Sequence, residues 1–423
     1  MNRADESLAS VEEVAASIAA AIVVVPAAAV PLPQAAGRVL AEPVRAPSPL
    51  PRFDNAAMDG YAVRASDVAG ADPDTPTALR LVAPSSAGQV TPPELPVGCA
   101  CPIATGAPMP AGADAVIMLE HAVEHGDRVL VPRSVDRGRN VRRRGEDVAA
   151  GMELLHPGQV VTAGQLVAAA ALGRTTLQVR RPPRVTVVLT GTEVVPAGQP
   201  PAEHQVVDAV GPALQALLGD VGCTVATLGP IDDDPDVLAA TLLEAATDSD
   251  AVITVGGASV GRHDHLKQVL RRHGDLHAWR VALRPAKPFV FGVVAGTAVF
   301  GLPGNPVSAL VAYEVFVRPA LLAMQGRSGD RPRREAQLTE PFSQPPGRLH
   351  LVRAQCWMAA GRCLVRPVGA QGAGMVHALA AANAWMVVPP EVEHLPAGAL
   401  VEVWPLWGQE PAGTGAGSVR VRP

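Results

Sequence analysis

Arg184-Val-Thr-Val-Val-Leu-Thr-Gly-Thr-Glu193 opens a segment in which short apolar runs alternate with helical patterns. Strands are expected at 185–189, 224–228 and 251–255, and helices near 206–218, at 235–246 and after Asp264. This βαβ alternation predicts a largely parallel sheet with helices on both faces. Ligands of such sheets bind at the carboxyl ends of the strands. We therefore expect the turns at 190–193 and 256–261, which directly follow strands, to approach a ligand.

Other patterns flank this segment. The N-terminal residues predict an amphipathic helix behind Ser7, with Glu12 and Glu13 opposite an apolar stripe formed by Leu8, Val11, Val14, Ala15, Ile18 and Ile22. Residues 43–147 carry short apolar runs between Pro and Gly turns, which indicates a β-rich domain. A helix is expected around 164–172, and β-like runs return after Arg327. The chain is therefore predicted to have several domains.

Composition narrows the class of protein. The formal net charge of -5 provides no broad positive field for nucleic acid, so a small-molecule ligand is expected. The five cysteines include no Cys-x-x-Cys pair, which disfavours a disulfide framework or structural zinc. The apolar run from Ala15 to Leu32 is broken by Pro26 and Pro31, and no basic region precedes it. We expect a cytoplasmic protein that does not span a membrane.

Gly301-Leu-Pro-Gly-Asn-Pro-Val-Ser308 is the first candidate binding segment. It follows a strand expected at 297–300, and Asn305 can cap the next helix with Pro306 at its first position. Helix amides would then hold an oxyanion, and Ser308 could add a hydroxyl donor. Taken alone, the segment also fits an ordinary strand-to-helix turn.

A second candidate is Arg284-Pro-Ala-Lys-Pro288, which places two cations at the end of a strand expected at 279–283. Lys287 and Lys267 are the only lysines in the chain, so Lys287 is a candidate for oxyanion binding. Arg280 would lie inside the expected strand. The alternative for this segment is a solvated loop.

Acidic residues recur at expected loop positions, namely Asp59, Asp147, Glu193, Asp208, Asp233 and Asp264. Carboxylates beside phosphate sites commonly hold Mg²⁺, which prefers oxygen ligands. Each has a structural alternative, since Asp234 and Asp264 could cap helices and Asp233 could belong to a polar turn. The run Arg142-Arg-Arg144 beside Asp147 suits a pyrophosphate, although a surface ion-pair loop fits too. No P-loop or His-Glu-x-x-His motif is present.

Taken together, these segments resemble the molybdopterin molybdenumtransferase family, which includes the E domain of gephyrin. The matching motifs span nearly the whole chain: Ala36-Gly-Arg-Val-Leu-Ala41, Met58-Asp-Gly-Tyr-Ala62, Thr105-Gly-Ala-Pro108, 142–147, 190–193, 256–264, 284–288 and 301–308. The resemblance implies an α/β plus β, multidomain, elongated chain with a central parallel-sheet domain of the molybdopterin-binding type. The implied domains are a helical one from 1–46 and 148–183, an inserted β-rich one at 47–147, the α/β domain at 184–328, a C-terminal β-barrel at 329–410, and a disordered tail at 411–423.

The resemblance also implies an activity, the insertion of molybdate into adenylylated molybdopterin with release of AMP and with Mg²⁺ as cofactor. It implies a homodimer whose site is shared across the interface, and a molybdopterin adenylyltransferase as a possible partner. The implied catalytic residues are Asp59, Asp147, Glu193, Asp233, Asp264 and Lys287, with Glu193, Asp233 and Asp264 at the metal. The implied substrate-binding residues are Thr105, Arg142, Ser259, Arg280, Arg284, Pro288, Asn305, Ser308 and Arg353.

The chain departs from the family pattern at several of these motifs. Thr192 replaces an Asp, Ala286 replaces a Gly, and Arg284 replaces a Lys. Arg262 stands in the Gly-rich turn where an acidic residue is usual, and Ala373 replaces a Ser. Two alternatives therefore stay open: a molybdopterin-binding paralogue or scaffold with weakened activity, and a related molybdopterin adenylyltransferase. The latter class lacks the inserted domain that carries Met58-Asp-Gly-Tyr61.

Overall fold

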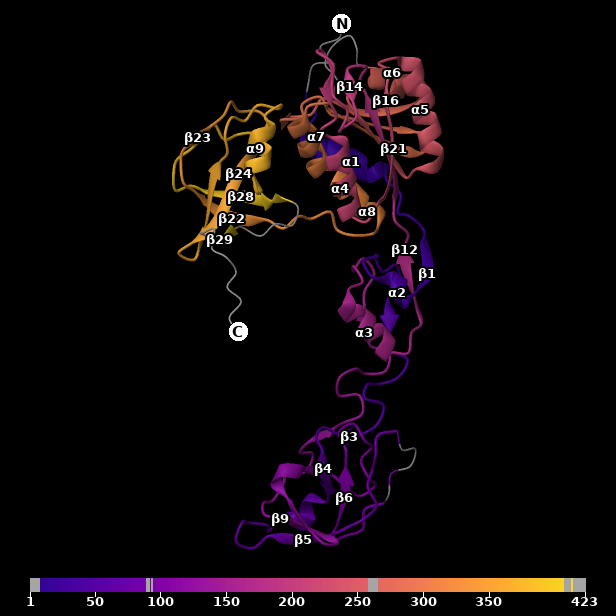
Figure 1. The fold of residues 1–423 in the computed structure, drawn as a ribbon, viewed down its shortest axis with the longest axis vertical. Coiled ribbons are helices and arrows are strands. Elements are labelled where there is room, and N and C mark those ends of the chain that lie inside the picture. Colours follow the sequence, from indigo (N-terminus) through magenta and orange to yellow (C-terminus); the bar gives the residue numbers. More distant parts are fainter. Residues whose placement is uncertain (1–7, 89–91, 93, 258–264, 407–411, 414–423) are drawn as a thin grey trace. The chain divides into compact units, whose positions relative to one another are not determined.

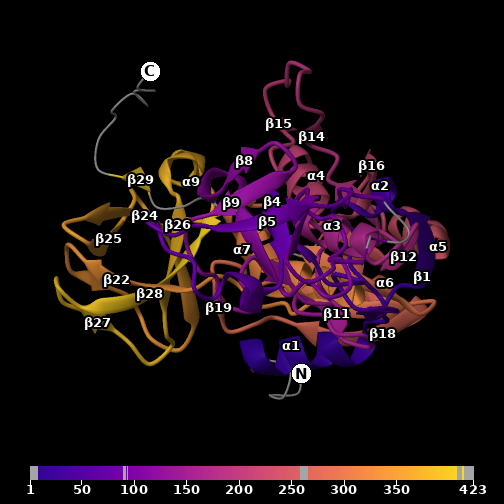
Figure 2. The same cartoon turned by 90° about the horizontal axis from the view of Figure 1, so that it is seen from below.

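The computed structural model describes residues 8–88, 92, 94–257, 265–406 and 412–413. The chain divides into two compact units, described separately below (Figures 1 and 2). Unit 1 comprises residues 1–41, 157–162 and 176–423, and unit 2 comprises 42–156 and 163–175.

Unit 1 is built on a six-stranded sheet with the order β16-β13-β17-β21-β20-β18. The strands are β13 (Arg184–Thr190), β16 (Thr224–Ile231), β17 (Ala251–Val255), β18 (Gly274–Trp279), β20 (Val290–Val294) and β21 (Thr297–Leu302). Strands β16, β13, β17 and β21 run parallel to one another, whereas β20 and β18 pair antiparallel with their neighbours. The predicted largely parallel sheet is confirmed, with an antiparallel edge that the sequence did not indicate.

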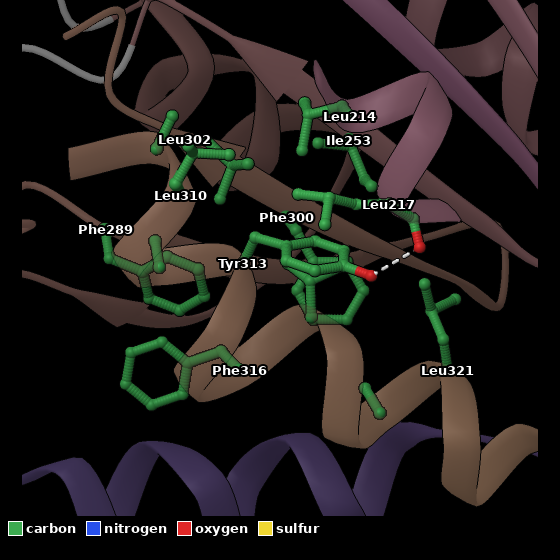
Figure 3. Close-up of a cluster of buried hydrophobic side chains, with 14 of the residues drawn as sticks. Leu214, Leu217, Ile253, Phe289, Phe300, Leu302, Leu310, Tyr313, Phe316 and Leu321 are labelled. Atoms are coloured by element: carbon green, nitrogen blue, oxygen red, sulfur yellow. Dashed lines mark hydrogen bonds between the residues drawn. The ribbon is translucent and has the colours of Figure 1, made fainter. Parts of the chain in front are cut away.

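Helices cover both faces of this sheet. Successive strand residues point to opposite sides, so each strand contributes to two cores. Val187 packs into one core with α4 (Gly211–Asp220) and the helix formed by α7 (Pro306–Ala312), the π-helical turn η4 (Tyr313–Val317) and α8 (Arg318–Met324). Val188 packs on the other face against α5 (Pro235–Asp248) and α6 (His265–His273). Figure 3 shows the first core, where the buried Tyr313 hydroxyl donates to the Leu217 carbonyl oxygen at 2.9 Å.

The continuous helix Pro306–Met324 is long and apolar enough to cross a membrane, the only such helix among the described residues. Within its most apolar window 78% of the residues are buried inside unit 1. Its apolar surface is therefore used in the core of the α/β fold.

The N-terminal helix α1 (Val11–Ala21) begins later than expected. Ser10 caps it, accepting from the Glu13 amide at 3.0 Å while Glu13 accepts from the Ser10 amide at 2.8 Å. Leu8 precedes the helix and Ile22 follows it, whereas Val14 and Ile18 are buried as predicted. Both join the α/β core, while α3 (Ala163–Ala171) belongs to unit 2. The two compact units therefore divide the implied helical domain of 1–46 and 148–183, whose bounds stay a prediction.

The C-terminal part of unit 1 is a closed barrel. Its strands are β22 (Arg334–Leu338), β24 (Leu349–Ala359), β25 (Arg362–Pro367), β26 (Ala384–Val388) and β28 (Leu400–Pro405), and the pairing of β24 with β26 closes the ring. The short strand β19 (Leu283–Arg284) adds to β24 from outside. Ala412–Gly413 form β29, which also pairs with β24. The other residues of the implied disordered tail, 411 and 414–423, lie outside the described residues, so that expectation stays a prediction.

Unit 2 contains a six-stranded sheet with the order β7-β4-β6-β5-β9-β8, which confirms the predicted β-rich segment. The strands are β4 (Gly60–Val63), β5 (Thr77–Leu81), β6 (Cys99–Ile103), β7 (Ala115–Met118), β8 (Val123–His125) and β9 (Arg128–Val131). Two further short strands, β3 (Asn55–Ala56) and β10 (Val141–Arg142), pair beside it.

Two expected elements in unit 1 are different in the structure. The helix expected from 206 begins at Gly211, because Val206–Val207 form β15, paired with β14 (Val194–Val195). The strand expected at 279–283 is interrupted, because β18 ends at Trp279 and Arg280 has a φ of 76°. Arg280 therefore lies in a left-handed turn between β18 and β19, outside any strand.

The ion pair at the amino end of β17 makes unit 1 acid-sensitive. Burial alone would raise the pKa of Asp250, but hydrogen bonds from Arg181, at 2.6 Å to each carboxylate oxygen, and from the Arg184 amide hold that pKa below its usual value. A depressed folded-state pKa stabilises above the unfolded value of about 3.9, and this contribution is lost as the pH falls through the folded-state pKa. We expect Asp250→Asn to lower stability at pH 7 and to lose less stability than wild type between pH 5 and 3. Urea unfolding across this pH range measures both, and parallel pH profiles would contradict the assignment.

Candidate functional site

The carboxyl ends of the parallel strands meet at one edge of the unit 1 sheet, as predicted. The Gly256 amide after β17 donates to the Leu302 carbonyl oxygen of β21 at 3.0 Å. On the other side, the Thr190 hydroxyl of β13 donates to the Val255 carbonyl oxygen at 3.2 Å. The Gly191 amide donates to Ile231 at the end of β16. The turns that follow four strands are therefore joined by direct hydrogen bonds.

A cavity of ≈ 530 Å³ opens over these turns. Its wall contains the predicted candidates Glu193, Asp208 and Asn305 and parts of the turns expected to approach a ligand, together with residues not predicted. The lining is Leu189, Thr190, Glu193, Val194, Val206, Val207, Asp208, Ala209, Val210, Val255, Gly256, Gly304, Asn305, Pro306 and Gly374. Its size suits a small organic ligand.

Glycine at 256 keeps this cavity open. Gly256 has a φ of +90°, and a Cβ there would lie 2.7 Å from the Thr190 hydroxyl and 2.9 Å from the Thr190 carbonyl oxygen. A side chain would therefore separate the turns of β13 and β17. Ser259 and Asp264, predicted from the continuation of this turn, lie outside the described residues.

The start of α7 departs from the predicted oxyanion site. Asn305 is the N-cap residue and Pro306 the first helical residue, as expected, but the Asn305 side chain makes no capping hydrogen bond. The Val307 amide donates to the Ala373 carbonyl oxygen at 3.3 Å, so that donor is occupied by the barrel loop. Ser308 is only 4% exposed. Asn305 thus keeps its side chain at the cavity, whereas Ser308 lies inside the fold.

Two carboxylates line the cavity, Glu193 and Asp208. Asp208 accepts from the amides of Val210 at 3.0 Å and Gly211 at 2.8 Å, so it holds the start of α4. Glu193 is exposed and retains its oxygens for a ligand. Asp233 is exposed in the loop after β16, and the adjacent Asp234 caps α5 as predicted.

The carboxylates fit one mode of metal binding. No three His, Cys, Asp or Glu side chains cluster as ligands within the described ranges. Mg²⁺ is usually held by one or two protein carboxylates, with substrate phosphate oxygens and waters completing its shell. The exposed Glu193 beside an open cavity suits that arrangement and does not suit an all-protein cage.

The loop from Arg280 to Pro288 lies at the same edge of the sheet. Val290 pairs with both Gly301 and Trp279, so the antiparallel β20 starts where β21 ends. Lys287 is exposed, and Pro288 is half-buried. The Arg280 guanidinium lies 4.2 Å from the centre of the Trp279 ring, and this contact holds the guanidinium at the start of the loop.

Arg284 connects this loop to the barrel. It lies in β19 opposite His350 of β24. Burial and the nearby Arg348 lower the pKa of Arg284. Burial, followed by the charges of Arg284, Arg353 and Arg348, lowers the pKa of His350 to about 3. His350 is therefore neutral at physiological pH and adds no positive charge to this arginine cluster.

Ala286 is strained in this loop. Its φ is 89°, a region that favours glycine, and it is buried. We expect Ala286→Gly to raise the free energy of unfolding by about 1 kcal/mol, because relief of backbone strain exceeds the loss of one buried methyl group. Denaturant unfolding measures it. Ala295 also has a positive φ, 49°, but its side chain is exposed, so Ala295→Gly shows the backbone effect without the loss of a buried methyl group. A loss of stability in Ala286→Gly would contradict the proposed strain.

Arg353 has a different position from the one expected of an oxyanion ligand. It is 1% exposed, and its guanidinium donates to the carbonyl oxygens of Ala370 at 3.2 Å and Gly372 at 2.8 Å, and to the Gln371 side chain at 3.2 Å. Gln371 returns a hydrogen bond to the Arg353 carbonyl oxygen. Arg353 therefore fixes the loop that brings Gly374 to the cavity, a role that its sequence position did not signal.

Two of the four predicted residues of unit 2 are in direct contact. Asp59 accepts from the Thr105 amide at 2.6 Å and from its hydroxyl at 2.9 Å, and these bonds lower the pKa of Asp59. Arg142 is exposed in β10, next to the segment that carries Asp59. Asp147 is exposed and donates its amide to Leu50. The structure thus joins Asp59 and Thr105 directly, and shows no contact of Arg142 or Asp147 with that pair within the described residues.

Comparison with known proteins agrees with this architecture. Family models described as MoeA N-terminal region (domain I and II), probable molybdopterin binding domain and MoeA C-terminal region (domain IV) match residues 9–173, 186–323 and 335–406. A solved molybdopterin biosynthesis moeA protein from Pyrococcus horikoshii is 30% identical with a TM-score of 0.83, covering 95% of this chain and 100% of that one. The fold is therefore that of the MoeA proteins.

Curated relatives identify the family more closely. Molybdopterin molybdenumtransferase 2 of Mycobacterium tuberculosis is 40% identical over 384 residues, which cover 89% of this chain and 94% of that protein. The molybdopterin molybdenumtransferase of Haemophilus influenzae is 35% identical over 378 residues, covering 88% and 92%. This chain belongs to the molybdopterin molybdenumtransferase family.

Proposed function

We propose that this protein inserts molybdate into adenylylated molybdopterin and releases AMP. The observation that carries the proposal is the cavity at the carboxyl edge of the unit 1 sheet, with Glu193 and Asn305 in its wall. The cationic loop around Lys287 starts at the same edge. An acidic and amide-lined cavity beside a cationic loop suits a substrate that joins a polar pterin to a pyrophosphate.

The protein's task in this reaction is positioning and charge neutralisation. Molybdate and the substrate pyrophosphate are both anions, so their approach requires fixed cations. Lys287 and Arg284 would bind molybdate, with Ser259, Arg280 and Pro288 beside them. Asn305 would contact the pterin, Ser308 would support it from within α7, and Arg353 would position the loop 370–375.

Carboxylates supply the remaining part of the site. Glu193, Asp233 and Asp264 would hold Mg²⁺, which when bound would polarise the pyrophosphate oxygens. Asp59, Asp147, Thr105 and Arg142 of a second copy would complete the site in a homodimer. The adenylylated substrate would come from a molybdopterin adenylyltransferase in the cytoplasm.

The test is a turnover assay with purified protein, adenylylated molybdopterin, molybdate and Mg²⁺. AMP release and cofactor formation are expected, with loss of both in excess chelator. Substrate binding without turnover would overturn the enzyme and favour a paralogue or scaffold. Adenylylation of molybdopterin by ATP would instead favour the adenylyltransferase. Light scattering tests the homodimer separately, and a monomer at assay concentration would contradict the shared site.

A further inference from the structure

The C-terminal barrel holds two cysteine side chains in direct contact. The Cys356 sulfur of β24 lies 2.9 Å from the Cys363 sulfur of β25, the next strand in the chain, which pairs with β24 antiparallel (Figure 2). Both cysteines are free thiols. Neither has a role in the proposed reaction, so their contact points to a separate chemistry.

A two-residue turn fixes the register that brings these thiols together. Ala360 and Gly361 connect β24 to β25, and both have positive φ angles, 48° and 76°, as a type I′ hairpin turn requires. In this register Cys363 lies opposite Met358, two residues along the strand from Cys356. Alternate residues of a strand share a face, and both cysteines pack with the core of the barrel. The hairpin therefore makes them diagonal neighbours on the inward face.

The backbone of Cys356 is also held from the side of β26. The side chain of Asn383, which precedes β26, accepts from the Cys356 amide at 2.7 Å and donates to the Cys356 carbonyl oxygen at 2.8 Å. A disulfide bond is about 2.0 Å long, so the two sulfurs need to approach by only about 1 Å. Groups already held in place by a sheet lose little further freedom when they react with each other.

The two thiols differ in their access to solvent. Cys363 is half-buried, whereas Cys356 is only 2% exposed. Burial, followed by the hydrogen bond with Cys363, raises the pKa of Cys356 to about 12, so this thiol keeps its proton at neutral pH. An oxidant dissolved in water therefore reaches Cys363 first, and Cys356 is placed to react with the oxidised product.

We propose that Cys356 and Cys363 form a modification site at which a hydroperoxide, such as hydrogen peroxide, produces a reversible disulfide that stabilises the barrel. The Cys363 thiolate attacks one peroxide oxygen and the O–O bond breaks. The sulfur becomes a sulfenic acid, and the Cys363 proton leaves with the other oxygen as water. The Cys356 sulfur then attacks the Cys363 sulfur and the S–O bond breaks, while the Cys356 proton leaves with the hydroxyl group as a second water. Two thiols are thus oxidised to one disulfide, and one hydrogen peroxide is reduced to two waters.

The stabilising effect follows from where the bond would form. It would join two paired strands of the barrel and restrict the unfolded chain. Strand β24 also carries Arg353, whose guanidinium holds the loop 370–375. Oxidation would therefore strengthen the strand pair that supports this loop.

The test uses the full-length protein, first reduced and then treated with a small molar excess of hydrogen peroxide. Remaining thiols are blocked with N-ethylmaleimide in denaturant, and tryptic peptides are analysed by mass spectrometry without reduction. Arg362 lies between the two cysteines, so trypsin places them in different peptides and only a disulfide joins these. The joined pair should appear and should disappear with dithiothreitol. The oxidised protein should have a Tm several degrees higher than the reduced protein.

Cys99 and Cys101 provide a matched control in the same sample. They alternate along β6 in unit 2 and are both buried, but the Cys101 thiol donates to the Ala83 carbonyl oxygen at 3.2 Å. Buried thiols without a reactive neighbour are inert, so both should be oxidised about tenfold more slowly than Cys363, or slower still.

Two variants separate the steps of the reaction. Cys356→Ala should leave Cys363 as a sulfenic acid that dimedone traps, whereas Cys363→Ala should leave Cys356 unmodified. The proposal would be overturned by oxidation of Cys363 without the joined peptides in wild type, by equally fast oxidation of Cys99, or by a lower Tm of the oxidised protein. These three results come from the wild-type chain, so they hold even if a variant does not fold. None depends on turnover, so failure of the proposed reaction is detected independently.

Discussion

Replacing Lys287 by methionine should lower kcat/KM for molybdate insertion by about 10²–10³-fold, while stability stays within about 0.5 kcal/mol of wild type. Lys287 is exposed, and within the described part of the chain its ammonium group has no recorded ion pair. Its charge is therefore available to an anion at the edge of the sheet over which the cavity opens. AMP release at varied molybdate concentrations, together with denaturant unfolding, measures both quantities.

Two companion variants separate the effect of a cation at position 287 on activity from the effect of the net charge of the protein. Lys287→Arg keeps a cation in place and should recover part of the activity. Arg333→Gln removes one exposed positive charge far along the chain and should be silent. An unchanged dependence on molybdate in Lys287→Met would remove this residue from the site, whatever the effect on total activity.

Gly60→Ala should destabilise unit 2 by about 3 kcal/mol, the largest stability effect that we expect. Gly60 begins β4 and pairs with Met118 of β7. A Cβ at this position would overlap the carbonyl oxygen of Ile117, which belongs to the backbone and cannot rotate away. Because Asp59 precedes Gly60, the same change should disturb the Asp59–Thr105 hydrogen bonds. Urea unfolding measures the loss.

Gly70→Ala is the matched control within the same unit. It is exposed, and no atom lies within 4 Å of the Cβ that it would acquire. It should be neutral or slightly stabilising, since alanine restricts the unfolded chain. Equal effects at positions 60 and 70 would show that the close approach of β4 to β7 does not require glycine.

The sequence predicted the centre of the unit 1 sheet well because β13, β17 and β21 are buried on both faces and read as continuous apolar runs. It failed from 279 to 284, where long-range contacts decide the structure. The left-handed Arg280 and the pairing of Leu283 with Leu349 depend on residues distant in the chain. Propensity and periodicity contain no record of such contacts, so one continuous strand was expected.

In the candidate site, too, some residues could be predicted from the sequence and others could not. Glu193 and Asn305 could be predicted because each follows a strand on a Gly-containing turn. Asp208, one of the acidic candidates, lies in the cavity wall, but its side chain also holds the start of α4. The buried state of Arg353 could not be inferred, because an arginine in a β-like run is more often exposed. Burial converted an expected ligand into a support for the loop at 370–375.

The pairing of β19 has a consequence for how this protein can be divided. The Ala282 carbonyl oxygen accepts from the Leu349 amide of the barrel, and the Ala282 amide donates to the Ala9 carbonyl oxygen just before α1. The backbone leading to Arg284 is thus tied to both ends of unit 1. A fragment limited to 184–328 would keep the sheet and lose both ties. Grafting the α/β segment alone into another protein would therefore transfer the sheet without these two restraints on its cationic loop.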